Sequence, residues 1–299
     1  MAERIGFLGP GLMGRGIVKN LLKKGFPVMV YAHREGLNLA ELIEAGATVT
    51  KSLAELGAAN DQVCLCVPSS KEVEAAVLGT DGLLGSMRPG SILIDFSTSH
   101  PTSTRMLWDR LKEKKIAFLD APMTGTPVHA NAGEINLMIG GEKAAYETCL
   151  PVFRAVAKNI FHVGPSSHGN IVKLINNFLG QLTNAALAEV LPLAAKAGVD
   201  MKGLFDAVRV SGGNSRMFEG VVPAVCSRNF AVAFELRLAH KDMAYLSSVG
   251  RELDAPLPLV NSLLNVLDLA KASGLGRENT NALVKLYEQI LHLEVKGAL

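Results

Sequence analysis

The sequence predicts an α/β fold in which an N-terminal Rossmann-type domain is followed by an all-α C-terminal domain, entered by one long interdomain helix. Two observations support this prediction. Strand-like and helix-like segments alternate up to about residue 164, which is typical of a parallel sheet with crossover helices. After Gly164 the strand signals vanish, and one helical pattern runs from Asn170 to Ala197 and ends at Gly198.

The expected strands are short apolar runs. They are continuously apolar rather than alternating, as in 62–67, and this pattern suits strands that are covered on both faces of a sheet. Amphipathic stretches such as 12–24 and 102–115 lie between them and predict helices. The expected strands are 4–9, 27–32, 62–67, 91–95, 116–120, 135–140 and 160–163.

A glycine-rich turn joins the first expected strand to the first expected helix. The first glycine of the G-x-G-x-x-G pattern permits a tight turn, the second lets the backbone approach a pyrophosphate, and the third allows close helix–strand packing. The helix N-terminus that follows favours an anion. A chance match is the alternative, but the strand–turn–helix context favours a bound dinucleotide. The turn consists of Gly9, Pro10, Gly11, Leu12, Met13 and Gly14.

We therefore assign residues 1–164 to an NAD(P)-binding domain and 165–299 to a helical domain for substrate binding and oligomerisation. NAD-selective folds place Asp or Glu about 20 residues beyond the first glycines to bind the ribose 2′-hydroxyl. Here Ala32 stands near that position and is followed by His33 and Arg34. A guanidinium without the acid favours a 2′-phosphate, so we expect NAD(P) with a preference for NADP. The alternative is a solvent-facing turn with incidental charge.

Composition and charge argue against several other classes of protein. The 299 residues are 48% hydrophobic and 19% charged with a formal net charge of +2, so we expect no nucleic-acid partner. No uninterrupted apolar run approaches the roughly 20 residues that span a bilayer, so we expect no membrane association. The first strand begins almost at once, which leaves no room for a signal peptide. Four scattered cysteines fit a reducing compartment, and we expect a cytoplasmic protein.

Cysteines and histidines predict no metal site, because no grouping of His, Cys, Asp and Glu has metal-ligand spacing. Cys64 and Cys66 lie two apart in an apolar strand, so both should point to one face and belong to the core. A different pattern follows the strand at 116–120, where residues 120–127 are rich in hydroxyls and small side chains. Such a loop can bind an anion such as a carboxylate, although a plain turn explains it equally well.

The long helix carries Lys173 and Asn177, four residues apart and therefore on one face. Few charges occur from Ile171 to Leu187, which indicates burial on most sides. Burial can lower the pKa of a lysine from about 10.4 to roughly 7–8, where the amine serves as an acid or base near neutrality. Such a change costs roughly 4 kcal/mol, which favours a functional role over the alternative of a surface lysine beside a solvated asparagine.

Together these motifs resemble those of the β-hydroxyacid dehydrogenase family, whose members include 3-hydroxyisobutyrate dehydrogenase and tartronate semialdehyde reductase. The resemblance runs the whole length and rests on 9–14, 120–126, Gly133 with Gly140-Gly141, 169–177 and His240-Lys241-Asp242. It implies that Lys173 and Asn177 are catalytic. It implies substrate contacts from Thr124, Gly125, Thr126 and Asn176, and cofactor contacts from Val67, Pro68, Thr98 and Lys241. Lys241 alone could also be a helix-surface charge.

The substrate loop departs from the family pattern. The family usually has Ser-Gly-Gly where this chain has Thr124-Gly125-Thr126. Both hydroxyls can donate, but the Thr126 side chain changes the shape of the pocket. We expect a small anionic hydroxy acid or semialdehyde, and its anion stays open between carboxylate and sulfonate. A sulfolactaldehyde reductase also departs from Ser-Gly-Gly here, but it has Arg in place of Gly125.

The resemblance implies hydride transfer between the nicotinamide and a 3-hydroxy acid, with Lys173 as the general base in oxidation and the general acid in reduction. The alternative is a catalytically inert NAD(P)-binding scaffold, which would not need Lys173. A decarboxylating 6-phosphogluconate dehydrogenase would need a larger helical domain, and imine reductases usually replace the lysine. Apolar surface on helical segments such as 282–291, together with the family's usual assembly, predicts a homodimer or homotetramer.

Overall fold

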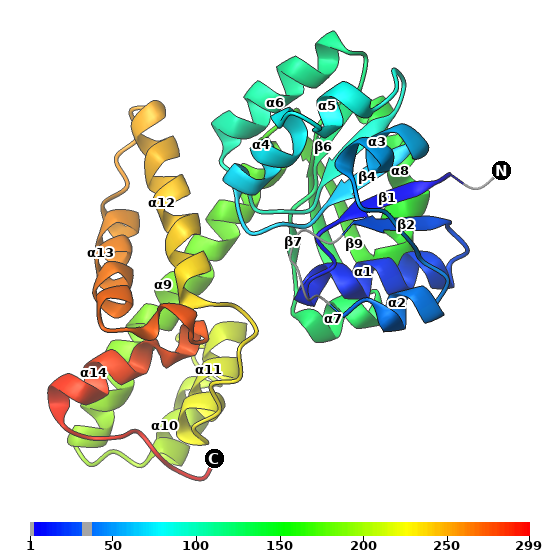
Figure 1. Ribbon diagram of the computed structural model, residues 1–299. Helices are drawn as coiled ribbons and strands as arrows, with labels where there is room; N and C mark the ends of the chain where they lie inside the picture. Colours follow the sequence, from blue (N-terminus) through cyan, green and yellow to red (C-terminus); the bar gives the residue numbers. More distant parts are fainter. Residues whose placement is uncertain (1–2, 32–37) are drawn as a thin grey trace. The chain divides into compact units, whose positions relative to one another are not determined.

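The computed structural model describes residues 3–31 and 38–299. The chain forms two compact units, Met1–Lys173 and Leu174–Leu299. The first is a sheet with helices on both faces, and the second is built of helices (Figure 1). The predicted fold class is confirmed, whereas the domain boundary expected between residues 164 and 165 stays a prediction. His33 and Arg34 lie outside the described residues.

The sheet of the first unit has the strand order β3-β2-β1-β4-β5-β6-β8-β7, and β9 pairs with β8. All seven expected strands are present. The two-residue strands β3 and β7 were not expected, because a pair of residues leaves no recognisable apolar run. The strands are β1 (Ile5–Leu8), β2 (Val28–Tyr31), β3 (Thr48–Val49), β4 (Gln62–Leu65), β5 (Ile92–Asp95), β6 (Ala117–Asp120), β7 (Met123–Thr124), β8 (Ile135–Gly140) and β9 (Ala157–Gly164).

The expected parallel sheet has one departure, at the edge formed by β7 and β8. The strands from β1 to β6 are parallel, but β8 runs antiparallel to β6 and β7. The chain leaves β6, forms β7 and the short helix α7 (Pro127–Ala132), and returns beside β6 without crossing a face of the sheet. Such a return gives an antiparallel pair. Helix α8 (Lys143–Val156) then connects β8 to β9, which are parallel to each other.

Helices cover both faces of the sheet. Phe7 and Cys64 contribute to a buried cluster with α1, α7 and α8, and Leu8 and Leu65 contribute to a second cluster with α3 to α6. Cys66 packs against the same cluster as Cys64, which confirms the prediction that both cysteines belong to one side of the core. The remaining helices of this unit are α1 (Leu12–Lys23), α2 (Ala40–Glu44), α3 (Leu53–Ala59), α4 (Ser70–Leu78), α5 (Leu83–Ser86) and α6 (Pro101–Glu113).

The second unit is helical throughout its described residues apart from turns and an isolated bridge. Its core gathers apolar residues such as Leu191, Val222, Met243 and Leu267. The predicted long helix is present as α9 (His168–Lys196). The other elements are α10 (Met201–Val208), α11 (Arg216–Cys226), α12 (Leu236–Glu252), α13 (Pro258–Ala272), the 3₁₀ turns Leu275–Arg277 and Thr280–Leu283, and α14 (Val284–Leu291).

Helix α9 is the single helix in the described chain that is long and apolar enough to cross a bilayer by length and composition. Buried helices of soluble proteins satisfy the same criterion, so this is weak evidence of a span. Several polar residues of α9 have partners inside the protein. Asn184, for example, is buried and its Nδ2 donates to the carbonyl oxygen of Thr280 at 2.8 Å.

A buried carboxylate ties the first turn of α9 to the sheet. Asp120 ends β6 and has no solvent exposure. Its Oδ1 accepts the Ser167 amide and its Oδ2 accepts the Asn170 amide, both at 2.8 Å. Burial is the largest cause that raises the pKa of Asp120, from 3.8 to about 7; the two amide hydrogen bonds oppose the rise, and the nearby Asp95 carboxylate adds to it.

The raised pKa of Asp120 predicts how stability depends on pH. From about pH 4 to 7 the folded protein holds a proton that the unfolded chain releases, so this contribution to the free energy of unfolding is lost as pH rises through 7. The stability of the wild type relative to Asp120→Asn should therefore fall by up to about 4 kcal/mol between pH 4 and 8. Urea unfolding followed by the fluorescence of Trp108, the single tryptophan, measures it in the first unit. A difference that is constant or grows with pH contradicts the assignment.

Candidate active site

The glycine-rich turn leaves β1 and enters α1. Gly9 has a φ of +88°, and a Cβ there would lie 2.4 Å from the carbonyl oxygen of Cys66. A Cβ on Gly14 would lie 2.3 Å from the carbonyl oxygen of Gly9, so the packing of α1 on β1 requires glycine. Gly11 differs, because no described atom lies within 4 Å of its Cβ position and no side chain of the described residues caps α1 there. An uncapped helix N-terminus beside open space fits a pyrophosphate.

The other predicted cofactor residues of the first unit follow neighbouring strands. The strand order reverses between β1 and β4, and ligands of such sheets bind outside the carboxyl ends of the strands at this point. Val67 and Pro68 follow β4, and Thr98 follows β5. The Val67 amide donates to Ser97 Oγ at 2.9 Å, which joins the ends of these two strands. The structure thus brings these residues and the glycine-rich turn to one edge of the sheet.

The turn residues differ in exposure. Leu12 is exposed, Met13 packs partly against the core, and Pro10 is buried. The turn is therefore covered by the protein at Pro10 and Met13 and open at Leu12.

Lys173 lies on α9 one helical turn beyond Asn170 and is partly buried. The Asn170 side chain adds to the anchor formed by its own amide. Its Oδ1 accepts the Ser99 amide at 2.8 Å, and its Nδ2 donates to Thr104 Oγ1 at 3.1 Å. One turn of helix spans about 5 Å along the axis, so the backbone of Lys173 stands close to an anchor made by several hydrogen bonds.

Asn177 is one further turn along α9 and lies in the second unit. It is buried, its Nδ2 donates to Asp242 Oδ2 at 2.6 Å, and its Oδ1 accepts from Asn176 Nδ2 at 3.2 Å. Asp242 is itself buried on α12, and its Oδ1 lies 3.2 Å from Lys241 Nζ. The predicted residues Asn176, Asn177 and Lys241 are therefore linked through Asp242, and Lys241 is ion-paired.

The hydroxyls of Thr124 and Thr126 in the predicted substrate loop differ in their hydrogen-bond partners. Thr124 Oγ1 accepts from Asn136 Nδ2 at 2.9 Å, so this hydroxyl has a proton to donate. The Thr126 amide donates to His129 Nδ1 at 3.2 Å, and Thr126 Oγ1 lies 2.8 Å from the same nitrogen. Both the amide and the hydroxyl of Thr126 therefore have a partner within the loop. In this arrangement the Thr126 hydroxyl is engaged within the loop, unlike the Thr124 hydroxyl proton.

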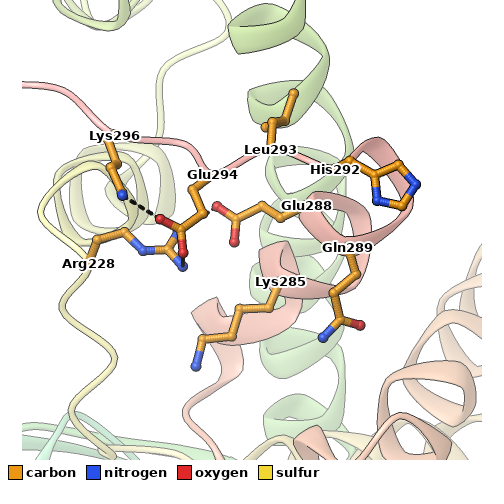
Figure 2. A pocket seen from close by; sticks show the side chains of 8 residues that line it. All are labelled: Arg228, Lys285, Glu288, Gln289, His292, Leu293, Glu294 and Lys296. Carbon is orange, nitrogen blue, oxygen red and sulfur yellow. Dashed lines mark hydrogen bonds and ion pairs between the residues drawn. The ribbon is translucent and has the colours of Figure 1, made fainter.

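An open cavity of about 860 Å³ lies in the second unit, around the end of α14 (Figure 2). Its cations are paired with carboxylates: Arg228 with Glu288 at 2.5 Å and Lys296 with Glu294 at 2.5 Å. These pairs leave the cavity poorly suited to an anionic substrate, and none of the predicted site residues lines it. The lining residues are Arg228, Lys285, Glu288, Gln289, His292, Leu293, Glu294 and Lys296.

Among residues 3–31 and 38–299, no group of three or more His, Cys, Asp and Glu side chains is placed to hold a metal ion.

Three residues that support the site received no role from the sequence. Asp120 anchors α9, Asp242 fixes Asn177, and His129 holds Thr126. The sequence did indicate that Asp120 needs a partner, because a charged residue at the end of an apolar strand must be paired when it is buried. The Thr-x-x-His spacing from 126 to 129 is that of an N-cap residue and the third residue of a helix. Nothing in the sequence indicated the contact of Asp242 with Asn177, beyond the place of Asp242 in the His-Lys-Asp motif.

The open space at Gly11 predicts that alanine there affects ligand binding and not folding. Gly11→Ala should raise the Kd for the dinucleotide at least tenfold, because the new methyl group takes space that the pyrophosphate needs. Fluorescence titration with NADH and NADPH measures the Kd, and thermal unfolding should be unchanged. Gly85→Ala is the matched control, since Gly85 also has no described atom within 4 Å of its Cβ position and lies in α5. Equal Kd values for the two variants would refute the assignment.

Two family models match the chain. The one described as the NAD binding domain of 6-phosphogluconate dehydrogenase matches residues 4–164. The one described as NAD-binding of NADP-dependent 3-hydroxyisobutyrate dehydrogenase matches residues 167–287. Together they cover both the sheet with its glycine-rich turn and most of the helical unit.

Similar proteins extend over nearly the whole chain. The 2-(hydroxymethyl)glutarate dehydrogenase of Eubacterium barkeri is 33% identical over 98% of this chain and 98% of its own length. The L-threonate dehydrogenase of Cupriavidus necator is 32% identical over 97% of this chain and 98% of its own length. A crystal structure of 3-hydroxyisobutyrate dehydrogenase from Salmonella typhimurium has a TM-score of 0.85 at 29% identity, covering 95% of this chain and 99% of that one. The chain therefore belongs to the β-hydroxyacid dehydrogenase family and is an NAD(P)-dependent dehydrogenase acting on CH–OH groups.

Proposed function

We propose that the protein oxidises a small 3-hydroxy acid, or reduces the matching semialdehyde, with Lys173 as the general base and acid. The observation that supports this is the position of Lys173 on α9, one turn beyond an amide that Asp120 holds. The nicotinamide accepts or supplies the hydride when the cofactor is bound. The Lys173 amine takes the hydroxyl proton in oxidation, and the ammonium returns a proton to the carbonyl oxygen in reduction.

Neighbouring side chains would orient the reacting groups. Asn177 is proposed to orient Lys173 or to donate to the reacting oxygen, and its contact with Asp242 limits the rotation of its amide. The Thr124 hydroxyl is proposed to donate to the acid group of the substrate, and Gly125, Thr126 and Asn176 are proposed to line the pocket around that group. Holding that group fixes the reacting carbon, and such positioning supplies much of the rate enhancement of two-substrate reactions.

The substrate class is supported by what the relatives are named for. 2-(Hydroxymethyl)glutarate, L-threonate and 3-hydroxyisobutyrate each carry a hydroxyl on the carbon β to a carboxylate. The predicted loop of this chain holds neutral donors, of which the Thr124 hydroxyl has a proton to give. We therefore propose a β-hydroxy carboxylate, with a sulfonate as the alternative anion. A panel of these acids and 2,3-dihydroxypropane-1-sulfonate, assayed with NAD and NADP, separates the two.

Cofactor preference, assembly and location extend the proposal. We propose NADP over NAD because Ala32 stands near the position where NAD-selective folds have an acid, and the cationic Arg34 follows it two residues later. We propose a homodimer or homotetramer, which the exposed apolar face of α9 supports through Ile175, Leu179, Val190 and Leu193. A cytoplasmic protein without nucleic-acid or membrane partners fits the nearly balanced charge.

Replacing Lys173 should separate chemistry from cofactor binding. We expect Lys173→Ala to lower kcat by about 10²–10⁴-fold, because the proton then has no positioned donor or acceptor. The Kd for NADPH should change less than about twofold, since Lys173 is proposed to act on the substrate side. Stopped-flow absorbance of the nicotinamide measures the rate, and fluorescence titration measures the Kd.

Lys196→Ala is the matched control, because Lys196 is exposed in the last turn of the same helix. Its kcat should equal that of the wild type. A Lys173→Ala variant that keeps most of its activity would remove Lys173 from the mechanism. A wild type that binds NADPH but turns over no acid or aldehyde of the panel would favour the inert scaffold.

A further inference from the structure

We propose that Asp120 is a positioning residue for Lys173: its buried carboxylate holds the first turn of α9 against the end of β6 and so sets where the lysine amine stands. This inference rests on the proposed function, because it requires Lys173 to be the group that moves the proton. Asp120 contacts backbone amides and is not itself proposed to touch the substrate.

The contact uses both carboxylate oxygens. Oδ1 accepts the amide of Ser167 and Oδ2 accepts the amide of Asn170, each at 2.8 Å. The first amides of a helix have no partner within the helix, and their dipoles favour a negative charge. The first intrahelical bond, from the Ile171 amide to the Ser167 carbonyl oxygen, begins beside this contact. Two oxygens on two amides fix the helix in direction as well as in place.

Glycines at positions 140 and 169 allow the sheet and the helix to approach closely at this contact. A Cβ on Gly169 would lie 2.4 Å from the Met138 carbonyl oxygen and 2.8 Å from Asp120 Oδ2. A Cβ on Gly140 would lie 2.5 Å from Asp120 Oδ1 and 2.8 Å from the Gly169 nitrogen. The first turn of the helix therefore packs closely against β6 and β8, and neither glycine position has room for a side chain.

This contact determines the position of the Lys173 backbone. It is one turn beyond Asn170 on the same helix, so a shift of the first turn moves the lysine backbone by a similar amount. A displacement of about 1 Å in a reacting group can lower a rate about 10²-fold. The Asn170 side chain, held by Ser99 and Thr104, resists rotation of the turn but does not replace the contact with β6.

Asp120→Asn tests the contact with a small change in shape. Asparagine has one acceptor oxygen, and its NH₂ group faces an amide that needs an acceptor. One of the two hydrogen bonds is therefore lost. We expect kcat to fall about 10–100-fold while the Kd for NADPH changes less than about twofold.

The decisive measurement is a double-mutant cycle with amine rescue. Turnover of Lys173→Ala and of Lys173→Ala/Asp120→Asn is measured with added ethylamine, using the panel acid that the wild type oxidises fastest. A free amine is not held by α9. Asp120→Asn should therefore lower the rescued rate less than about twofold, although it lowers kcat 10–100-fold when Lys173 is present.

Glu288→Gln is the matched control. Glu288 is also a buried carboxylate that accepts a backbone amide, that of Val295 at 2.8 Å, but it lies on α14 in the second unit. The Glu288→Gln substitution should lower the free energy of unfolding and leave kcat unchanged. If Asp120→Asn does not fold by circular dichroism, Asp120→Glu takes its place in the cycle. It keeps both oxygens and the charge and moves them by one methylene.

If Asp120→Asn lowers the ethylamine-rescued rate of Lys173→Ala as much as it lowers kcat when Lys173 is present, the inference is overturned. Equal losses would show a general structural effect. An unchanged kcat in a folded Asp120 variant would overturn it as well. If Lys173→Ala alone keeps full activity, the proposed function fails first. The two failures are therefore distinguishable.

Discussion

The contact between the Asp120 carboxylate and the first turn of α9 is the constraint on which the arrangement of the site depends. A carboxylate buried at the end of β6 is stable there only because it accepts two amides, and those amides belong to the helix that carries Lys173. Burial raises the pKa of the same group to about 7, which shows how strongly the surroundings oppose the charge. The helix is thus joined to the sheet at the edge where the predicted cofactor residues lie.

Residues of the candidate site lie at that edge because of the order of the strands in the sheet. In a sheet whose strand order reverses between β1 and β4, the loops after neighbouring strands diverge and leave room for a ligand. The glycine-rich turn follows β1, Val67 and Pro68 follow β4, and Asp120 follows on β6. The first unit therefore contains the predicted cofactor residues and Lys173, the proposed catalytic lysine, and the rest of α9 carries Asn177 among the helices of the second unit.

Much of this could be predicted from the sequence, because it depends on local patterns. Continuous apolar runs gave the seven main strands, the G-x-G-x-x-G spacing gave the turn, and the four-residue spacing of Lys173 and Asn177 gave their common face. The antiparallel β8 could not be predicted, since apolar runs do not encode strand direction. The two-residue strands were too short to leave a pattern.

The supporting residues were harder to find for a different reason. Asp120 and Asp242 act through partners that are distant in sequence, and such partners appear only in three dimensions; His129 differs, because its partner Thr126 lies three residues before it. The Thr126 hydroxyl illustrates the point: its residue type marks it as a possible donor to substrate, but in the structure it contacts His129 within the loop. Cofactor preference rests on Arg34, which lies outside the described residues.

The most direct measurement is a crystal structure of the protein with NADP and a non-reactive β-hydroxy acid analogue. The account predicts Lys173 Nζ within about 2.6–3.2 Å of the analogue's hydroxyl oxygen, and the Asp120 carboxylate still on the Ser167 and Asn170 amides. A Lys173 amine that projects into solvent, away from the reacting carbon and the nicotinamide, would contradict it.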